Sequence, residues 1–411
     1  MAMQDYIDRL VGLQGFSVSG LRFGEELSTL WIEVSRRHKE YRCTCGRVYR
    51  SYYDSRLRSV RDLSFGPFIR VWIEFFQCRI RCTTCGVRTE CLDWVEPRVG
   101  YTKRLAGAVA LACREIRSIK AVAQQFRLHW SVVKDIDKKA LQDCLPAVGN
   151  TQATLLAIDE FAVKRGQDYG TTVADAGTGQ VLYVGKGRSA ETLGPFFEAL
   201  GPEKCRRIQA IAMDAWRGYA KAKRKHCPDA ATVYDPFHLL QIYGRKVIDR
   251  VRIDECRKAS EENKAVIRGT KYLLLKNRKN LLTDREEPAR LRDLLAINQR
   301  LNTVYILKED LRRVWTYKRK AWAAKWLEAW CQRAPDSGIK PLIRFTKKLL
   351  YHKESILAHC DYPIHTSIIE GMNNKIKVIK RIAFGFRDFD YFALKIRSGQ
   401  GPSLVETRGA P

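Results

Sequence analysis

The sequence predicts an α/β protein in which helices cover a mixed sheet. A cysteine-bearing β-rich module and a helix-turn-helix precede that sheet, and a long all-α insertion interrupts it. Three observations support this prediction. Short apolar runs alternate with amphipathic segments between residues 154 and 236, two close cysteine pairs lie within residues 1–100, and residues 239–334 show helical periodicity with no strand pattern.

Charge is the strongest compositional signal. The 411 residues include 74 Lys and Arg against 45 Asp and Glu, a surplus of +29. Such a surplus indicates a polyanionic partner, with nucleic acid first and an anionic membrane surface second. An apolar fraction of 45% excludes a disordered chain. Because we find neither a signal-peptide pattern nor an apolar run of about 18 residues, we expect a reducing cytoplasmic location and no membrane insertion.

Residues 1–100 are expected to form a zinc-binding domain, with strands at residues 30–34 and 71–76. Two short cysteine pairs, each followed by a glycine, are typical of a zinc ribbon, in which two turns present four thiolates. The candidate ligands are Cys43, Cys45, Cys82 and Cys85. The first pair has one intervening residue instead of two, so Cys78 and Cys91 are alternative ligands. Four thiolates leave no open position, which favours structural zinc; ordinary buried thiols are the other interpretation.

Residues 101–148 are predicted to hold a DNA-binding helix-turn-helix. Ser118-Ile-Lys-Ala-Val-Ala-Gln-Gln-Phe126 is the first helix, and the second starts at Trp130. Ala123 is the small residue at the crossing, and Arg127 occupies the turn position where Gly is common. Four residues of the second helix are expected to face DNA: Trp130, Ser131, Lys134 and Lys138. A generic helical hairpin is the alternative.

The catalytic core is predicted in two parts, residues 151–240 and 341–398, separated by the helical insertion at residues 241–340. The first part reads β-β-β-α-β-α-β, with a further helix after Pro236. Its strands are expected at residues 154–158, 169–174, 181–184, 208–212 and 231–234, and its helices at 190–200 and 216–226. The second part is expected to hold helices at residues 341–359 and 367–380.

Three carboxylates are expected to meet at one edge of the sheet. Asp159 follows the first strand, Asp214 follows the fourth, and Glu370 starts the late helix. Hard oxygen ligands of this kind hold two Mg²⁺ (or Mn²⁺) ions for phosphodiester chemistry. Each residue also has a structural interpretation: Asp159 as a strand-end turn residue, and Glu370 as part of a capping box with Ser367. Glu160 is the second choice, because it points away from the strand-end position.

The chain resembles the transposases of bacterial insertion sequences, and among them the ISL-three family. The resemblance is carried by four stretches: Ala157-Ile-Asp-Glu-Phe-Ala-Val-Lys164, Ala212-Met-Asp-Ala-Trp-Arg-Gly-Tyr219, Tyr234-Asp-Pro-Phe-His-Leu-Leu240, and Ile369-Glu-Gly-Met-Asn-Asn-Lys-Ile-Lys377 with Ala383-Phe-Gly-Phe386. It implies a ribonuclease H-like core with an Asp-Asp-Glu site at Asp159, Asp214 and Glu370. Asp235 and His238 match the family's Asp-x-x-His motif, as an accessory to the reaction or as a helix cap.

The resemblance implies an enzyme that binds the inverted ends of an insertion sequence, cleaves DNA and transfers the strand to a target. Its partner would be double-stranded DNA, with Lys377 as a further contact. Because two ends must be paired, we expect a homodimer or higher oligomer, located in a bacterial cytoplasm at the nucleoid. The rival hypotheses are a non-catalytic DNA-binding regulator derived from a transposase and a ribonuclease H-like nuclease.

Overall fold

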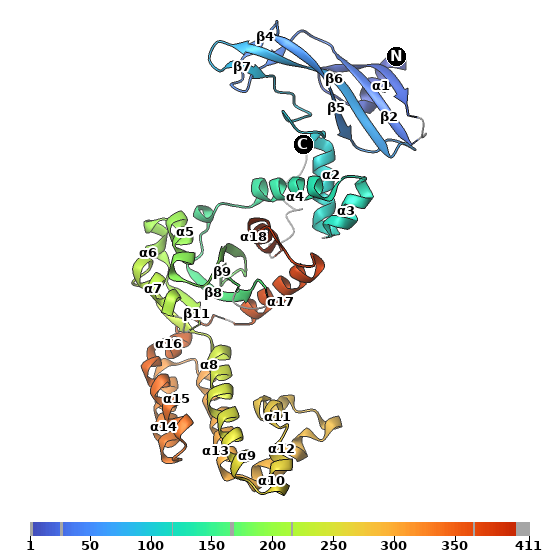
Figure 1. Ribbon diagram of the computed structural model, residues 1–411. Coiled ribbons are helices and arrows are strands. Elements are labelled where there is room, and N and C mark those ends of the chain that lie inside the picture. Colours follow the sequence, from blue (N-terminus) through green and yellow to red (C-terminus); the bar gives the residue numbers. More distant parts are fainter. Residues whose placement is uncertain are drawn as a thin grey trace. The chain divides into compact units, whose positions relative to one another are not determined.

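The computed structural model divides the chain into two compact units (Figure 1). One is Met1–Cys144 with Ile382–Phe384, and the other is Leu145–Arg381 with Gly385–Pro411. The structure describes residues 3–24, 28–116, 118–164, 168–214, 217–364 and 366–399, with the side chains of residues 3, 4, 217, 279 and 366–370 outside the description.

The first unit contains a five-stranded sheet of order β1-β2-β6-β5, with β7 paired to β6. Only the β2–β6 pair is parallel. Val71, Ile73 and Phe75 alternate along β6 and are buried on the face that also packs against Val11. A short β3–β4 hairpin extends this module. The elements are α1 (Met3–Val11), β1 (Phe16–Phe23), β2 (Thr29–Arg36), β3 (Tyr41–Arg42), β4 (Val48–Tyr49), β5 (Asp54–Asp62), β6 (Arg70–Cys82) and β7 (Gly86–Thr89).

Three helices follow in the same unit: α2 (Lys103–Glu115), α3 (Ile119–Phe126) and α4 (Trp130–Cys144). The Ser118 hydroxyl caps α3 by accepting a hydrogen bond from the Ala121 amide at 3.4 Å. Ala123 and Val133 are buried where α3 and α4 pack, which confirms the predicted helix-turn-helix.

The second unit is built around a mixed sheet of order β10-β9-β8-β11-β12. The pairs β10–β9 and β9–β8 are antiparallel, whereas β8–β11 and β11–β12 are parallel. This arrangement confirms the predicted mixed α/β architecture. The predicted order of strands and helices is wrong in one respect, because a second short helix, α6, follows α5. The elements are β8 (Leu155–Ala162), β9 (Tyr169–Asp175), β10 (Val181–Lys186), α5 (Ala190–Leu200), α6 (Pro202–Arg207), β11 (Ala210–Met213), α7 (Arg217–His226) and β12 (Ala231–Tyr234).

Helices cover both faces of this sheet. Alternate residues of β8, such as Leu156 and Ile158, pack against α5, α6 and α7. The intervening residues Ala157 and Phe161 face the late helices α17 (Thr366–Ile382) and α18 (Phe389–Ser398). Burial on both faces explains why the strands read as short apolar runs in the sequence.

Between residues 236 and 360, all of which are described, the chain forms helices and turns and no strand. Its core includes Tyr243 and Trp330, whose polar atoms donate hydrogen bonds to backbone carbonyls of α13. The helix predicted at residues 341–359 is wrong in one respect, because it is broken at His352. The helices are α8 (Pro236–Tyr243), α9 (Asp249–Lys258), α10 (Glu261–Ile267), α11 (Lys271–Leu275), α12 (Glu287–Ile297), α13 (Gln299–Arg312), α14 (Lys320–Asp336), α15 (Lys340–Tyr351) and α16 (Lys353–Leu357).

Candidate functional site

Three aspartates occupy one row across neighbouring strands of the mixed sheet. Met213 of β11 is paired with Ile158 of β8 on one side and with Tyr234 of β12 on the other. The next residue of each chain segment is an aspartate: Asp159, Asp214 and Asp235. Because all three strands are parallel, the three aspartates lie at the same level of the sheet.

Asp159 is a buried carboxylate held by two neutral donors. It is 4% exposed, and it lies within β8 rather than after the strand as predicted, because β8 continues to Ala162. Its Oδ1 accepts a hydrogen bond from the Glu160 amide at 2.8 Å, and its Oδ2 accepts one from Asn373 Nδ2 at 2.5 Å. Burial raises the pKa of Asp159 to about 6, against the lowering effect of these donors and of the nearby His238 charge.

Glu160 belongs to a different environment. Successive side chains of a strand point to opposite faces, so Glu160 lies on the face away from Asp159. There its Oε2 forms an ion pair with Arg188 Nη1 at 3.6 Å. This geometry agrees with the choice of Asp159 over Glu160 made from the sequence.

Asp235 and His238 form a pair at the start of α8. Asp235 is the N-cap residue, and its Oδ1 accepts a hydrogen bond from the Phe237 amide at 2.8 Å. Its Oδ2 lies 2.7 Å from His238 Nδ1. This contact raises the pKa of His238 to about 9, although burial acts in the opposite direction. The negative charges of Asp214 and Asp159 add to the rise, so the imidazolium lies close to the whole row.

Helix α17 passes over the row. Met372 and Ile376 are buried against the sheet, and Asn373 reaches Asp159. The Glu370 side chain lies outside the described residues. Its backbone belongs to α17 one turn before Asn373, on the same side of the helix. Since α17 already includes Thr366, Ser367 is inside the helix and not at the N-cap position that the capping-box interpretation requires.

Two residues of α17, Lys377 and Asn373, lie in different environments. Lys377, predicted as a DNA contact, is exposed, and its Nζ donates a hydrogen bond to Asn374 Oδ1 at 3.3 Å. Asn373 belongs to one of the stretches that carry the family resemblance, but its contact with Asp159 was not predicted from the sequence. Its position three residues after Glu370 was the available signal, because residues three apart share one side of a helix.

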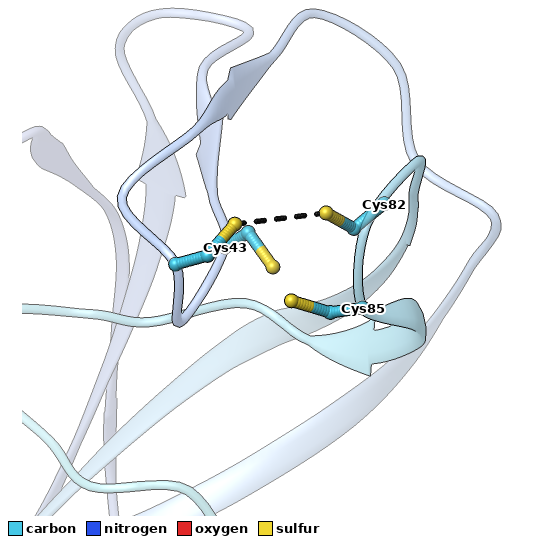
Figure 2. A group of neighbouring side chains, drawn as sticks. Cys43, Cys82 and Cys85 are labelled. Atoms are coloured by element: carbon cyan, nitrogen blue, oxygen red, sulfur yellow. Dashed lines mark hydrogen bonds between the residues drawn. The ribbon is translucent and has the colours of Figure 1, made fainter.

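The four predicted cysteines form one group in the first unit (Figure 2). The Sγ atoms of Cys43, Cys45, Cys82 and Cys85 all lie within 4.8 Å of one another. Cys43 and Cys45 lie in the turn between β3 and β4, whereas Cys82 and Cys85 flank the turn between β6 and β7. The turns close through Gly46 (φ +89°) and Gly86 (φ +72°), in the backbone region that glycine favours.

The surroundings favour a thiolate at Cys82, whereas the neighbouring Cys45 thiol raises the pKa of Cys85 to about 12. The Tyr49 hydroxyl donates a hydrogen bond to Cys82 Sγ at 3.2 Å. This bond lowers the pKa of Cys82 to about 6, with help from two backbone amides. Cys78 and Cys91, the alternative ligands, are outside the group of four, and burial raises the pKa of Cys78 to about 11.

The helix-turn-helix presents its predicted contact residues unequally. Trp130 is 55% exposed at the start of α4, next to the His129 ring. The Ser131 hydroxyl is hydrogen-bonded to His129 Nδ1, at a distance of 2.7 Å. The expectation that all four residues point outward is only partly right, because three of them flank the packed face of α4 and are half-buried: Ser131, Lys134 and Lys138.

Comparisons with known proteins place the chain in a family. A family model described as "Transposase", the DDE model of ISL3, matches residues 156–396. A second model, described as the helix-turn-helix domain of transposase family ISL3, matches residues 90–141. The chain is 40% identical over 400 residues to the transposase of insertion sequence element IS1001 from Bordetella parapertussis, which covers 95% of this chain and 97% of that protein. The chain belongs to the ISL3 family of transposases.

A second relative of this ISL3 transposase is the transposase of element IS1557 from Mycobacterium tuberculosis. It is 29% identical, over 89% of this chain and 88% of the relative. The resemblance stated from sequence motifs is therefore confirmed, as is an enzyme that cleaves and transfers DNA. The DDE domain implies divalent metal use, the cysteine group could hold a metal, and the helix-turn-helix indicates DNA binding.

Within the described part of the chain, no helix combines the length and the apolar composition that crossing a bilayer requires.

Proposed function

We propose that the second unit is a ribonuclease H-like core in which Asp159, Asp214 and Glu370 hold two Mg²⁺ (or Mn²⁺) ions. The observation that carries this proposal is the register of β8 and β11. Because Ile158 is paired with Met213, the two aspartates that follow them are direct neighbours. Three antiparallel strands followed by two parallel ones also fit this core.

The donor set fits a hard dication. Both oxygens of Asp159 accept one hydrogen bond each, which leaves each oxygen further accepting capacity. Both donors are neutral, so the buried negative charge of Asp159 is left for a cation to balance. Carboxylate oxygens are the ligands that Mg²⁺ prefers.

When bound, the two ions supply Lewis-acid stabilisation for hydrolysis of a phosphodiester and for strand transfer. In the first reaction water attacks phosphorus and the 3′-oxygen leaves. In the second, the freed 3′-hydroxyl attacks a target phosphodiester and displaces another 3′-oxygen. The chain orients Asp159 through Glu160 and Asn373. Asp235 holds a proton on His238 Nδ1, and this places a positive charge beside the row, suited to an approaching phosphate.

Recognition of the element ends is assigned to the first unit, and one further DNA contact to the second. Trp130, Ser131, Lys134 and Lys138 of α4 are the proposed contacts to the inverted ends, and Lys377 of α17 is a proposed phosphate contact. The four cysteines are proposed to bind structural zinc, which would fix the two turns that carry them. Pairing of two element ends requires at least a homodimer on DNA.

The catalytic assignment is tested by strand cleavage of a labelled DNA fragment carrying an element end. Asp159→Asn and Glu370→Gln preserve side-chain shape but remove a metal-binding charge, so cleavage should fall by about two orders of magnitude or more. Glu160→Gln, which faces the other side of the sheet, is the matched control and should retain most of the activity.

Two other outcomes would redirect the assignment. End binding without cleavage by the unmodified protein would favour the regulator hypothesis. Retained cleavage by Glu370→Gln would move the third ligand to Asp235, which already lies next to Asp214 in the row.

The zinc assignment predicts about one zinc per chain, bound through thiolates. Metal analysis of the full protein should give this ratio, and Cys43→Ser should reduce it strongly because tetrahedral coordination is lost. Cys91→Ser is the control and should leave the zinc content unchanged, since Cys91 is outside the group of four. Unchanged zinc in Cys43→Ser would contradict the assignment.

A further inference from the structure

Asn373 binds Asp159 through one end of its carboxamide. Its Nδ2 donates to Asp159 Oδ2 at 2.5 Å. The reverse orientation would set an amide oxygen against a carboxylate oxygen, so the donor end must face Asp159. The other end, Oδ1, is consequently directed away from that oxygen.

Asn373 Oδ1 is a buried acceptor with no hydrogen-bond donor within reach among the described residues. Buried polar atoms are nearly always paired, because an unpaired one loses its bonds to water without replacement. An isolated exception therefore needs an explanation, and an unfilled ligand position is one. Among the described residues, few other buried side-chain nitrogen or oxygen atoms lack a hydrogen-bond partner.

The location of this atom indicates which ligand it suits. Asn373 lies on α17, one turn after Glu370, and it touches the buried aspartate of the row. A carboxamide oxygen is a hard, neutral donor of the kind that Mg²⁺ and Mn²⁺ accept, directly or through a bound water. If Asn373 Oδ1 contacts the ion or a water of that ion, this oxygen needs no hydrogen bond from a Lys or Arg side chain.

We propose that Asn373 is a fourth residue of the catalytic metal site. Its Nδ2 fixes Asp159, and its Oδ1 contacts the divalent ion or a water of that ion. This inference rests on the proposed function, because it takes Asp159 and Asp214 as ligands of the same ion. Asn373 thereby combines a positioning role and a ligand role in one side chain.

Two substitutions separate these roles. Asn373→Ala removes both the donor and the oxygen. Asn373→Asp keeps an oxygen at the ligand position but replaces the donor with a second negative charge beside Asp159. Asn374→Ala is the matched control on the next residue of α17, where the side chain is exposed and bonds only Lys377 among the described contacts.

The experiment measures Mn²⁺ affinity by calorimetry without DNA, using full-length protein with its cysteine site loaded with zinc. The thermal unfolding temperature is measured with and without Mn²⁺ to confirm that each variant folds. Asn373→Ala should weaken Mn²⁺ binding by about tenfold or more, and Asn374→Ala should not change it. Asn373→Asp should bind Mn²⁺ at least as tightly as the unmodified protein and gain more thermal stability from the ion.

Unchanged affinity in Asn373→Ala would overturn the proposal entirely. Equal weakening in Asn373→Ala and Asn373→Asp would overturn the ligand role and leave Asn373 as a residue that only positions Asp159. A different result would sink the proposed function itself: if the unmodified protein shows no Mn²⁺ site that Asp159→Asn removes, the metal assignment fails and this inference fails with it.

Discussion

At the scale of single residues, the second unit places negative charge in a row and a basic side chain beside it. Three aspartates in register would repel one another if nothing balanced them. His238 is a basic residue close to the row, and Asp235 holds it by a 2.7 Å contact. The pair fixes the imidazole beside the row and also caps α8.

The raised pKa of His238 predicts a specific dependence of stability on pH. A folded-state pKa of about 9 against about 6.5 when unfolded means that the ion pair stabilises the fold fully below pH 6.5. This contribution, about 3 kcal/mol at most, is lost as pH rises through 9. His238→Asn should therefore lower the unfolding temperature at pH 6 and have little effect at pH 10.

Unfolding temperatures of both proteins across this range check the prediction, without added divalent ions. A difference that does not change with pH would contradict it. In the presence of Mg²⁺ the pKa of His238 should fall, because a dication at the row opposes a second positive charge. Titration of the imidazole by NMR measures that shift directly.

At the scale of elements, the turn of the helix-turn-helix stores strain. Arg127 has φ +53° and ψ +42°, the left-handed conformation that glycine adopts without a Cβ clash. The sequence already marked this position as one where glycine is common. Relief of this strain should exceed the entropy that a glycine loses on folding.

Arg127→Gly should therefore stabilise the α3–α4 pair by about 0.5–1 kcal/mol. Hydrogen exchange of amides in α3 and α4 should slow by about two- to fivefold, as that free energy implies. Gln124→Gly, on the exposed side of α3, is the control and should destabilise by about 1 kcal/mol. Faster exchange in Arg127→Gly would show that the arginine side chain contributes more than its backbone costs.

The positions of strands could be predicted well from the sequence where both faces of the strand are buried. The strands from β8 to β12 are covered on both faces, so each one leaves a short apolar run between polar turns. Prediction from the sequence failed where tertiary contacts determine where a strand or helix ends. Nothing local shows that β8 extends past Asp159, or that the helix breaks at His352, whose Nε2 lies 3.4 Å from the Tyr234 hydroxyl.

In the candidate site, too, some features follow from local sequence and others depend on tertiary contacts. Asp214 could be placed from a strand end, because it follows β11 directly, whereas Asp159 lies within β8 and was selected although the predicted strand end was wrong. The row of three could not, because it depends on a register that no sequence pattern specifies. Asn373 was missed because its position three residues after Glu370 indicates a shared side of the helix but does not indicate which strand residue its side chain contacts.

At the scale of the whole molecule, the surplus of 29 positive charges governs how the transposase meets DNA. Each phosphate that a Lys or Arg neutralises releases condensed counterions, so affinity falls with salt. The slope of log affinity against log salt counts those phosphates, at about 0.9 per contact. It reports contacts made, not net charge.

We predict that affinity for a DNA fragment carrying an element end falls by about 10³-fold or more between 50 and 200 mM salt, as for proteins with six or more phosphate contacts. Lys134→Ala on α4 separates two kinds of contact. If Lys134 neutralises a phosphate, the variant should bind all sequences more weakly and lose about one unit of slope. If it reads a base edge, the loss should be confined to the end sequence. Binding curves for end and unrelated fragments at several salt concentrations distinguish these outcomes. A slope below about 3 would contradict the prediction, because it corresponds to only about three phosphate contacts.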